Sequence, residues 1–201
     1  MRVFPGARLL VFAKAPVPGQ VKTRLITALG EAEAARLHER LVCRTLEVAV
    51  GGQFAPVSLW CSPTPDHPFF QNCRLRYGVT LCCQQGNDLG ERMAHAFEET
   101  LKESAMAVLI GTDCPSLSAK DLKTAFEALC HGSDAVLGPA EDGGYVLIGL
   151  RRPAPELFGD LPWGSGQVLS ETRARLHALN LSFHELPRRW DVDRPEDLMR
   201  L

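Results

Sequence analysis

Short apolar runs, each bounded by Gly, Pro, Asn or Asp, recur along the chain and predict buried strands. Runs of this length are too short to form stable helices of their own. They lie at residues 8–13, 56–61, 79–82, 105–110, 135–137 and 145–150. The pattern therefore predicts six strands in the protein interior.

Between these runs, apolar residues at steps of three and four predict amphipathic helices. These segments are residues 34–48, 89–101 and 122–129. Ser118 is the predicted N-cap of the third segment, because Asp121 follows it by three residues. Asp88 and Glu91 repeat this spacing at the start of the second segment. Gly132 follows the third segment and marks its end.

The alternation of strands and helices predicts an α/β fold, a three-layer αβα sandwich around a mostly parallel sheet. No internal repeat or linker-like stretch interrupts the sequence, so we expect residues 1–201 to form a single domain. In such sheets, ligands bind outside the carboxyl ends of the strands. The loops that follow the apolar runs are therefore where chemistry is expected.

The overall charge excludes some classes of partner. The 22 Lys and Arg residues nearly balance the 24 Asp and Glu residues, for a net charge of −2. This balance creates no broad positive field, so we expect neither nucleic acid nor a membrane as a partner. No apolar run approaches the roughly 18 residues of a membrane-spanning helix. We expect a soluble cytoplasmic protein whose binding sites are local.

The segment after the first predicted strand is basic and has the sequence KAPVPGQVKTR. Lys14, Lys22 and Arg24 are candidate phosphate ligands, because charge-assisted bonds to phosphate are strong. The segment is not a P-loop, since Val21 stands where that motif needs a glycine. Lys22 and Arg24 flank Thr23 without apolar periodicity, which favours binding over a role in stability. The alternative is a solvated surface loop.

An aspartate follows the fourth apolar run, in the sequence Gly-Thr-Asp-Cys-Pro. A carboxylate there, next to a phosphate-binding loop, suggests that Asp113 binds Mg²⁺ or Mn²⁺. The alternative is that Asp113 caps a helical turn beginning near Leu117. Near the C-terminus, Asp191 and Asp193 alternate along an extended segment and should point the same way. They suit a metal site or a solvated edge, and Asp193 also suits a helix N-cap.

The segment between the last two predicted strands is both acidic and rich in glycine. Glu141 and Asp142 are candidates for orienting a hydroxyl group or a second cation, and Gly143 and Gly144 allow backbone amides to approach a ligand closely. A hairpin turn uses the same residue types, because Asp-Gly is a common turn signal. Both interpretations remain open at this point.

Five motifs, taken in order, resemble the GT-A-type fold of nucleotide-sugar glycosyltransferases and small nucleotidyltransferases. They are FAKAPVPGQVKTRL, GNDLGERM, IGTDCPSLS, GPAEDGGYVLIGL and DVDRPEDL. The chain resembles a widespread bacterial group of GT-A-like transferases. It is similar in layout to 2-phospho-lactate guanylyltransferases and molybdenum-cofactor guanylyltransferases.

The resemblance implies a nucleotide bound over the first strand by Lys14, Lys22 and Arg24, and a divalent metal held by Asp113. The terminal motif is similar to that of CMP-sugar synthetases, which makes Asp193 a second metal ligand. Two departures concern the reaction itself. PGQVKTR replaces the glycine-rich loop of many nucleotidyltransferases, and the DxD motif of metal-dependent glycosyltransferases is reduced to Thr-Asp-Cys.

The resulting hypothesis is a metal-dependent nucleotidyltransferase that uses Mg²⁺ or Mn²⁺ and releases pyrophosphate. The alternatives are a glycosyltransferase with a nucleoside-diphosphate sugar donor and an inactive nucleotide-binding module that regulates a partner. The predicted catalytic residues are Lys22, Asp113 and Asp142. The predicted nucleotide ligands are Lys14, Gly19, Lys22, Thr23, Arg24 and Asp88, and the predicted metal ligands are Asp113 and Asp193. The predicted acceptor site comprises Glu141, Asp142, Gly143 and Gly144.

Overall fold

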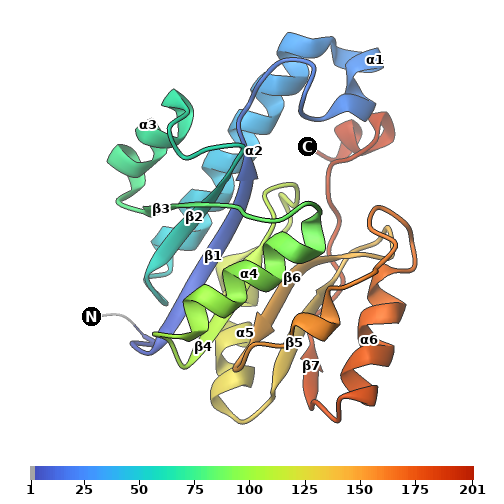
Figure 1. Ribbon diagram of the computed structural model, residues 1–201. Helices are drawn as coiled ribbons and strands as arrows, with labels where there is room; N and C mark the ends of the chain where they lie inside the picture. Colours follow the sequence, from blue (N-terminus) through green and yellow to red (C-terminus); the bar gives the residue numbers. More distant parts are fainter. Residues whose placement is uncertain (1–2) are drawn as a thin grey trace.

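The computed structural model describes residues 3–201, and within them seven strands form one mixed sheet (Figure 1). The spatial order of the strands is β3-β2-β1-β4-β6-β5-β7. β6 is antiparallel to both of its neighbours, β4 and β5, and the other pairings are parallel. The strands are β1 (Ala7–Lys14), β2 (Val57–Ser62), β3 (Thr80–Cys83), β4 (Met106–Ile110), β5 (Ala135–Pro139), β6 (Tyr145–Leu150) and β7 (Phe183–Glu185).

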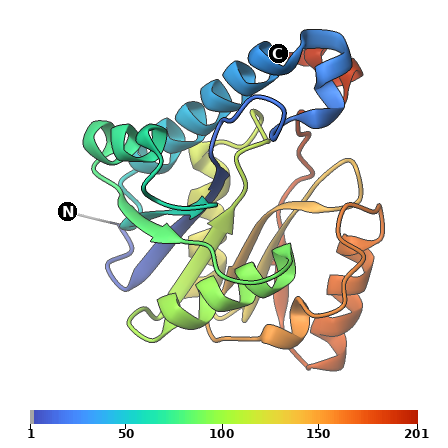
Figure 2. The same cartoon turned by 45° about the horizontal axis from the view of Figure 1, so that its top comes forward.

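Helices cover both faces of this sheet, which gives the predicted three-layer α/β architecture (Figures 1 and 2). α2, α3 and α5 pack on one face, and α4 and α6 pack on the other. Among residues 3–201, no helix is both long enough and apolar enough to span a membrane. The helices are α1 (Ile26–Leu29), α2 (Glu31–Gly51), α3 (Pro68–Tyr77), α4 (Leu89–Leu101), α5 (Ala119–Cys130) and α6 (Val168–Ala178), with 3-10 turns η1 (Thr23–Leu25), η2 (Pro155–Leu157) and η3 (Pro195–Arg200).

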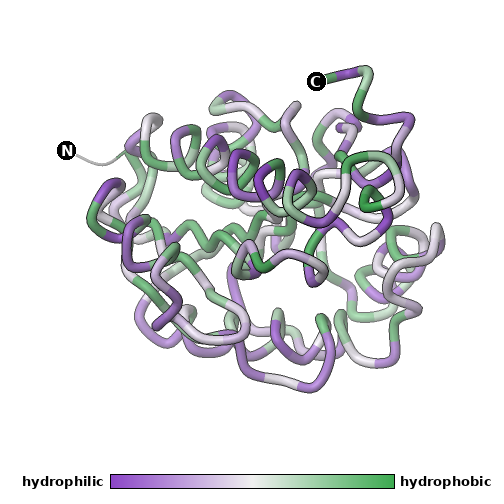
Figure 3. The backbone as a smooth tube through the Cα atoms, turned by 90° about the horizontal axis from the view of Figure 1, so that it is seen from above, coloured by the Kyte–Doolittle hydropathy of each residue, from purple (hydrophilic) through white to green (hydrophobic). Residues whose placement is uncertain are grey.

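The central strand β1 contributes to two separate hydrophobic cores. Leu9 and Val11 face the layer that contains α2, whereas Leu10 and Phe12 face the layer that contains α4. Successive side chains of a strand point to opposite faces, so a continuous apolar run fills both layers. Figure 3 shows the hydrophobic strands passing through the middle of the molecule between more hydrophilic outer segments.

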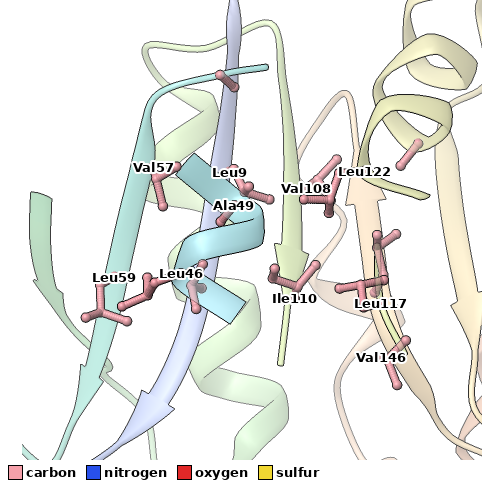
Figure 4. Packing of buried hydrophobic residues seen from close by; sticks show 14 of the residues in the cluster. Leu9, Leu46, Ala49, Val57, Leu59, Val108, Ile110, Leu117, Leu122 and Val146 are labelled. Atoms are coloured by element: carbon pink, nitrogen blue, oxygen red, sulfur yellow. The ribbon is translucent and has the colours of Figure 1, made fainter. Parts of the chain in front are cut away.

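The first core shows how a helix is fixed over the sheet. Leu46 and Ala49 of α2 lie over Leu9, Val57 and Leu59 of β1 and β2 (Figure 4). Leu9, Leu46 and Leu59 are fully buried. Burial of one such side chain contributes about 1.5–3 kcal/mol. The packing holds α2 rigidly behind the strands whose carboxyl ends carry the candidate site.

The six strands predicted from apolar runs are confirmed, and each lies within two residues of its predicted bounds. The three predicted helices are confirmed as α2, α4 and α5. The predicted caps also form, since Asp88 accepts a hydrogen bond from the backbone N–H of Glu91, at 2.8 Å. Ser118 and Asp121 exchange hydrogen bonds in a capping box at the start of α5.

The candidate functional site

The predicted loops meet at the carboxyl ends of the parallel strands, around a cleft of about 740 Å³. Figure 2 shows the segment after β1 beside the C-terminal turn η3, although these segments lie at opposite ends of the chain. Seven of the predicted site residues line the cleft. They are Lys14, Lys22, Thr23, Arg24, Asp88, Asp113 and Asp193. The fold thus brings the basic segment and two acidic segments to one place.

Lys22 is the most constrained of the basic residues. Its side chain is 4% exposed, and its Nζ lies 2.6 Å from Asp113 Oδ1 and donates to the carbonyl oxygen of Val192 at 2.5 Å. The backbone adopts a left-handed conformation there, with φ 49° and ψ 40°. Such a conformation in a non-glycine residue persists where its surroundings hold it. Lys22 therefore joins three segments that are far apart in the chain, contacts that the local sequence did not predict.

Arg24 forms a second ion pair across the cleft, with Asp193. Its side chain is 57% exposed, so this pair is screened by water far more than that of Lys22. In both pairs a predicted phosphate ligand contacts a predicted metal ligand. The charges of Lys22 and Arg24 are therefore compensated by Asp113 and Asp193. An anionic ligand that binds Lys22 or Arg24 has to replace the aspartate partner of that residue.

Neither Asp113 nor Asp193 is the cap of the helical turn that follows it. The helix that follows Asp113 begins at Ala119 with Ser118 as its cap, so the alternative role of Asp113 as a cap near Leu117 is wrong. Asp193 is likewise not the cap of η3, because Arg194 occupies that position. Both side chains instead line the cleft.

A third carboxylate of the cleft, Asp191, is crowded by like charges. Burial raises the pKa of Asp191 to about 6, and the negative charge of Asp142 is the next largest cause. Asp113 and Asp193 add smaller contributions in the same direction. Acidic side chains this close repel one another unless a cation lies between them.

The donor set fits a hard divalent cation. Mg²⁺ is usually held by one or two carboxylates, with the remaining positions taken by substrate phosphates and water. Asp113 and Asp193 supply two carboxylates, and the crowding of Asp191 shows a local excess of negative charge. Within residues 3–201, no three His, Cys, Asp or Glu side chains form a ready-made cluster.

His38 of α2 is a cleft residue that the sequence did not reveal, because it lies beside the apolar face of the helix. Its Nε2 lies 3.0 Å from the carbonyl oxygen of Lys14, so Nε2 carries the hydrogen. Nδ1 is buried, has no hydrogen-bond partner among residues 3–201, and lies 3.8 Å from Asp113 Oδ1. Burial lowers the pKa of His38, and the charge of Asp113 opposes that shift.

The acidic, glycine-rich segment is the hairpin loop between β5 and β6, as one of the two interpretations predicted. Asp142 accepts a hydrogen bond from the backbone N–H of Gly144 at 2.8 Å, whereas Glu141 forms an exposed ion pair with Arg200. Gly143 has φ +89° and touches the backbone of Gly166, so a side chain there would clash. Gly19 and the predicted acceptor residues Glu141, Asp142, Gly143 and Gly144 do not line the cleft. The negative charge of Asp142 nevertheless raises the pKa of Asp191, which does line it.

Backbone contacts hold the C-terminal acids against the turn that carries Asp113. The N–H of Val192 donates to the carbonyl oxygen of Asp113 at 2.8 Å. Ser116 bridges the same two segments, because its hydroxyl donates to the carbonyl oxygen of Trp190 at 3.0 Å. Long-range contacts of this kind bring Asp191 and Asp193 to the end of β4.

Solved structures with the same fold include three whose names refer to nucleotides. The "putative nucleotide-diphospho-sugar transferase" of Desulfovibrio desulfuricans G20 is 32% identical, with a TM-score of 0.86 over 95% of this chain and 84% of that one. The inositol-1-phosphate CTP transferase from T. maritima is 12% identical, with a TM-score of 0.64 over 98% and 93% of the two chains. The CMP:2-keto-3-deoxy-manno-octonic acid synthetase complexed with CTP is 12% identical, with a TM-score of 0.58 over 96% and 95%.

The predicted fold of nucleotide-diphospho-sugar transferases is confirmed by these likenesses. No curated protein matches the chain. A family model described as "Uncharacterized protein conserved in bacteria (DUF2064)" matches residues 45–165, which is more than half of the sequence. The protein therefore belongs to the DUF2064 family.

Proposed function

We propose that the protein is a metal-dependent nucleotidyltransferase, which moves a nucleoside monophosphate from a nucleoside triphosphate to a small acceptor. The observation that carries this proposal is the cleft lined by the cations Lys14, Lys22 and Arg24 together with the carboxylates of Asp113, Asp191 and Asp193. Cations bind phosphates, and carboxylates bind the divalent ion that accompanies a triphosphate. Two enzymes that share the fold carry CTP in their names, which supports a ligand that is a nucleotide.

In the proposed reaction, an oxyanion of the acceptor attacks the α-phosphorus of the triphosphate. A new phosphorus–oxygen bond forms as the bond to the β-phosphate oxygen breaks, and its electrons leave with pyrophosphate. Lys22 and Arg24 turn from their aspartate partners to the phosphate oxygens and stabilise the charge on the leaving group. Lys14 binds the same phosphates from the end of β1. Catalysis by these residues consists of positioning and electrostatic stabilisation.

The partner exchange frees Asp113 and Asp193 to hold Mg²⁺ or Mn²⁺. When bound, the ion supplies charge neutralisation at the phosphates. Thr23 and Asp88 complete the proposed nucleotide site in the cleft wall, and Gly19, with φ 79°, allows the turn of the segment that carries Lys22. The proposed acceptor site lies beside the hairpin loop of Glu141, Gly143 and Gly144, whose polar groups bond within the loop and to neighbouring segments. Asp142 Oδ1 accepts from the N–H of Gly144, and Oδ2 is the proposed atom that orients the acceptor.

Glycosyl transfer from a nucleoside-diphosphate sugar is the second candidate. A specific observation favours it, namely the 32% identity to a chain that carries the name of a nucleotide-diphospho-sugar transferase. In that reaction Asp113 holds the ion that binds the diphosphate leaving group, and Asp142 acts on the acceptor. A nucleotide-binding module without turnover is the third candidate. Such a module binds nucleotide but forms no product in the presence of a divalent metal ion.

The products separate these candidates. The purified protein is incubated with Mg²⁺, a panel of small phosphorylated and hydroxylated acceptors, and either the common nucleoside triphosphates or nucleotide sugars. Nucleotidyl transfer releases pyrophosphate from a triphosphate, whereas glycosyl transfer releases a nucleoside diphosphate from a nucleotide sugar. Release of diphosphate alone, with no pyrophosphate from any triphosphate, replaces the first candidate with the second. Binding without either product supports the third.

Arg24 gives a clean test of phosphate binding, because its side chain is exposed and its ion pair adds little stability. We expect Arg24→Gln to weaken nucleotide binding by about 1.5–3 kcal/mol through loss of a charge-assisted hydrogen bond. The melting temperature should stay within a few degrees of the wild type. Titration calorimetry with the Mg²⁺–nucleotide complex measures the change.

The matched control for this test is Arg36→Gln. Arg36 is also exposed and pairs with Glu33 on α2, outside the cleft. The control should bind nucleotide like the wild type. Equal affinities of Arg24→Gln and Arg36→Gln would remove Arg24 from the phosphate site.

A further inference from the structure

The wall of the cleft on the β3 side offers a fixed hydrogen-bond acceptor. Gln84 follows β3, and its side-chain Nε2 donates to the carbonyl oxygens of Trp60 at 2.8 Å and Ala13 at 3.3 Å. Its backbone N–H donates to the carbonyl oxygen of Cys61 at 3.0 Å. Both hydrogens of the amide are thus used by strand ends, and a flipped amide would face its oxygen towards two carbonyls. The free polar atom of the Gln84 side chain is Oε1, an acceptor.

Two neighbours of Gln84 extend this surface. The side-chain amide of Asn87 donates to Glu91 at 2.9 Å, which leaves its oxygen as a second acceptor. Leu89, at the first position of α4, is 45% exposed and lines the cleft. The other large exposed hydrophobic side chains among residues 3–201 lie outside the cleft wall. An exposed apolar side chain next to fixed acceptors suits a flat heterocycle with donor groups on its edge.

The strand order places this surface beside the phosphate site. Gln84 follows β3, and its side-chain amide extends over the ends of β2 and β1, where it contacts Trp60 and Ala13. β4, which leads to Asp113, is the neighbour of β1 on the other side. Gln84 and Asp113 line the same cleft, so a nucleotide with its phosphates beside Asp113 can extend towards Gln84 with its base.

We propose that Gln84 is the residue that reads the nucleobase, and that it selects a base with an exocyclic amino group. The amino group donates a hydrogen bond to Gln84 Oε1 while the ring packs on Leu89. This inference rests on the proposed function, because it takes the ligand to be a nucleotide. Cytosine, adenine and guanine carry such a group.

Discrimination follows from the fixed polarity of Gln84. In uracil a carbonyl oxygen replaces the amino group of cytosine, and two acceptors then face each other without a hydrogen between them. Gln84 has no free N–H to offer, because Ala13 and Trp60 already hold both of its amide hydrogens. A site whose buried polar groups are left unpaired rejects such an analogue strongly.

The test compares nucleotides that differ in this group. Titration calorimetry of the wild type with Mg²⁺ measures CTP against UTP, ATP against ITP, and GTP against ITP. We expect the tightest triphosphate to carry an amino group and to bind at least about tenfold more tightly than its counterpart. If the tightest triphosphate is UTP or ITP, or if the tightest amino-bearing triphosphate binds no more tightly than its counterpart, the proposal is overturned.

Substitutions at two positions, Gln84 and Leu89, separate recognition of the base from packing against it. Gln84→Leu removes the acceptor and should bring the affinity ratio of the discriminated pair close to one. Gln84→Met, with an unbranched side chain of similar length, is the second variant for the case that Gln84→Leu does not fold. Leu89→Ala should weaken all triphosphates alike and leave the ratio unchanged. A ratio that persists in a folded Gln84 variant assigns the selection to another residue.

The outcomes also distinguish this proposal from the proposed function. Pyrophosphate release without discrimination between paired bases overturns the role of Gln84 and leaves nucleotidyl transfer intact. Discrimination that depends on Gln84, without release of pyrophosphate, upholds the base-reading role and removes nucleotidyl transfer. Binding of no triphosphate overturns both.

Discussion

Replacement of Asp113 by Asn is expected to reduce metal-dependent nucleotide binding and turnover by at least about 100-fold, because the amide loses the negative charge that a divalent ion needs. Asn is the informative substitution. The side-chain oxygen of Asn still accepts a hydrogen bond from the buried ammonium of Lys22, which would otherwise lose its partner at this position. Titration with Mn²⁺ alone and with nucleotide present measures the loss directly.

The control for Asp113→Asn is a carboxylate outside the cleft. Glu99 on α4 forms an exposed ion pair with Lys102, and Glu99→Gln should leave metal and nucleotide binding unchanged. Asp113→Ala is expected to lose more stability than Asp113→Asn, because the ammonium of Lys22 keeps Val192 as its remaining acceptor. Unchanged Mn²⁺ affinity in Asp113→Asn would refute the assignment of Asp113 as a metal ligand.

The strands that position this site could be predicted because they are buried on both faces. β4 and β6 consist almost wholly of buried apolar residues, and a continuous apolar run is the signal that such strands leave in a sequence. β7 has three residues, none of them buried, and left no signal. α3 buries two side chains, Phe70 and Cys73, so its polar sequence carries too little periodicity to predict a helix.

The residue types of the candidate site could also be predicted, but not their pairing. Lys22 and Asp113 were identified separately as a phosphate ligand and a metal ligand. Their ion pair, and the hydrogen bond from Lys22 to Val192, join residues far apart in the chain. Such contacts depend on the packing of segments that the local sequence does not position. The place of His38 in the cleft could not be predicted for the same reason, since its neighbour Asp113 lies far away in the sequence.

A consequence of the pairing concerns the order of binding. A divalent ion that arrives alone has to take Asp113 from Lys22 and leave a buried ammonium beside it. A nucleotide that arrives alone has to take Lys22 from Asp113 and leave a carboxylate near Asp191. Arrival of both together leaves every charge with a partner. Under the proposed function, we therefore expect the site to bind an ion and phosphates together more readily than either one alone.

Substitution of Arg189 by Met is expected to cost about 3–5 kcal/mol of stability, because it leaves the carboxylate of Asp121 buried without its cation. The guanidinium of Arg189 donates to both oxygens of Asp121, at 3.1 and 2.5 Å, and the Asp121 side chain is 4% exposed. Ser118 supplies the remaining hydrogen bonds, at 2.9 and 2.7 Å. The pair anchors the C-terminal segment to the start of α5, so nucleotide affinity should also fall.

The pH dependence of this loss identifies its cause. Burial of Asp121 opposes ionisation, but the hydrogen bonds from Arg189 and Ser118 outweigh it and lower the pKa of Asp121. A lowered folded-state pKa contributes stability above the unfolded value, about 3.9, and that contribution is lost as the pH falls through the folded value. In Arg189→Met, only the hydrogen bonds from Ser118 oppose the effect of burial on the pKa of Asp121. As the pH falls, Asp121 therefore becomes protonated at a higher pH in the variant than in the wild type, and the penalty for its buried charge disappears. The difference in unfolding free energy between wild type and variant should therefore shrink from pH 7 towards pH 4.

The double variant Asp121→Asn/Arg189→Met, which buries no charge at this point, should be less destabilised at pH 7 than Arg189→Met. Equal losses at both pH values, in the single and double variants alike, would mean that packing of the Arg189 side chain rather than its charge holds the segment in place.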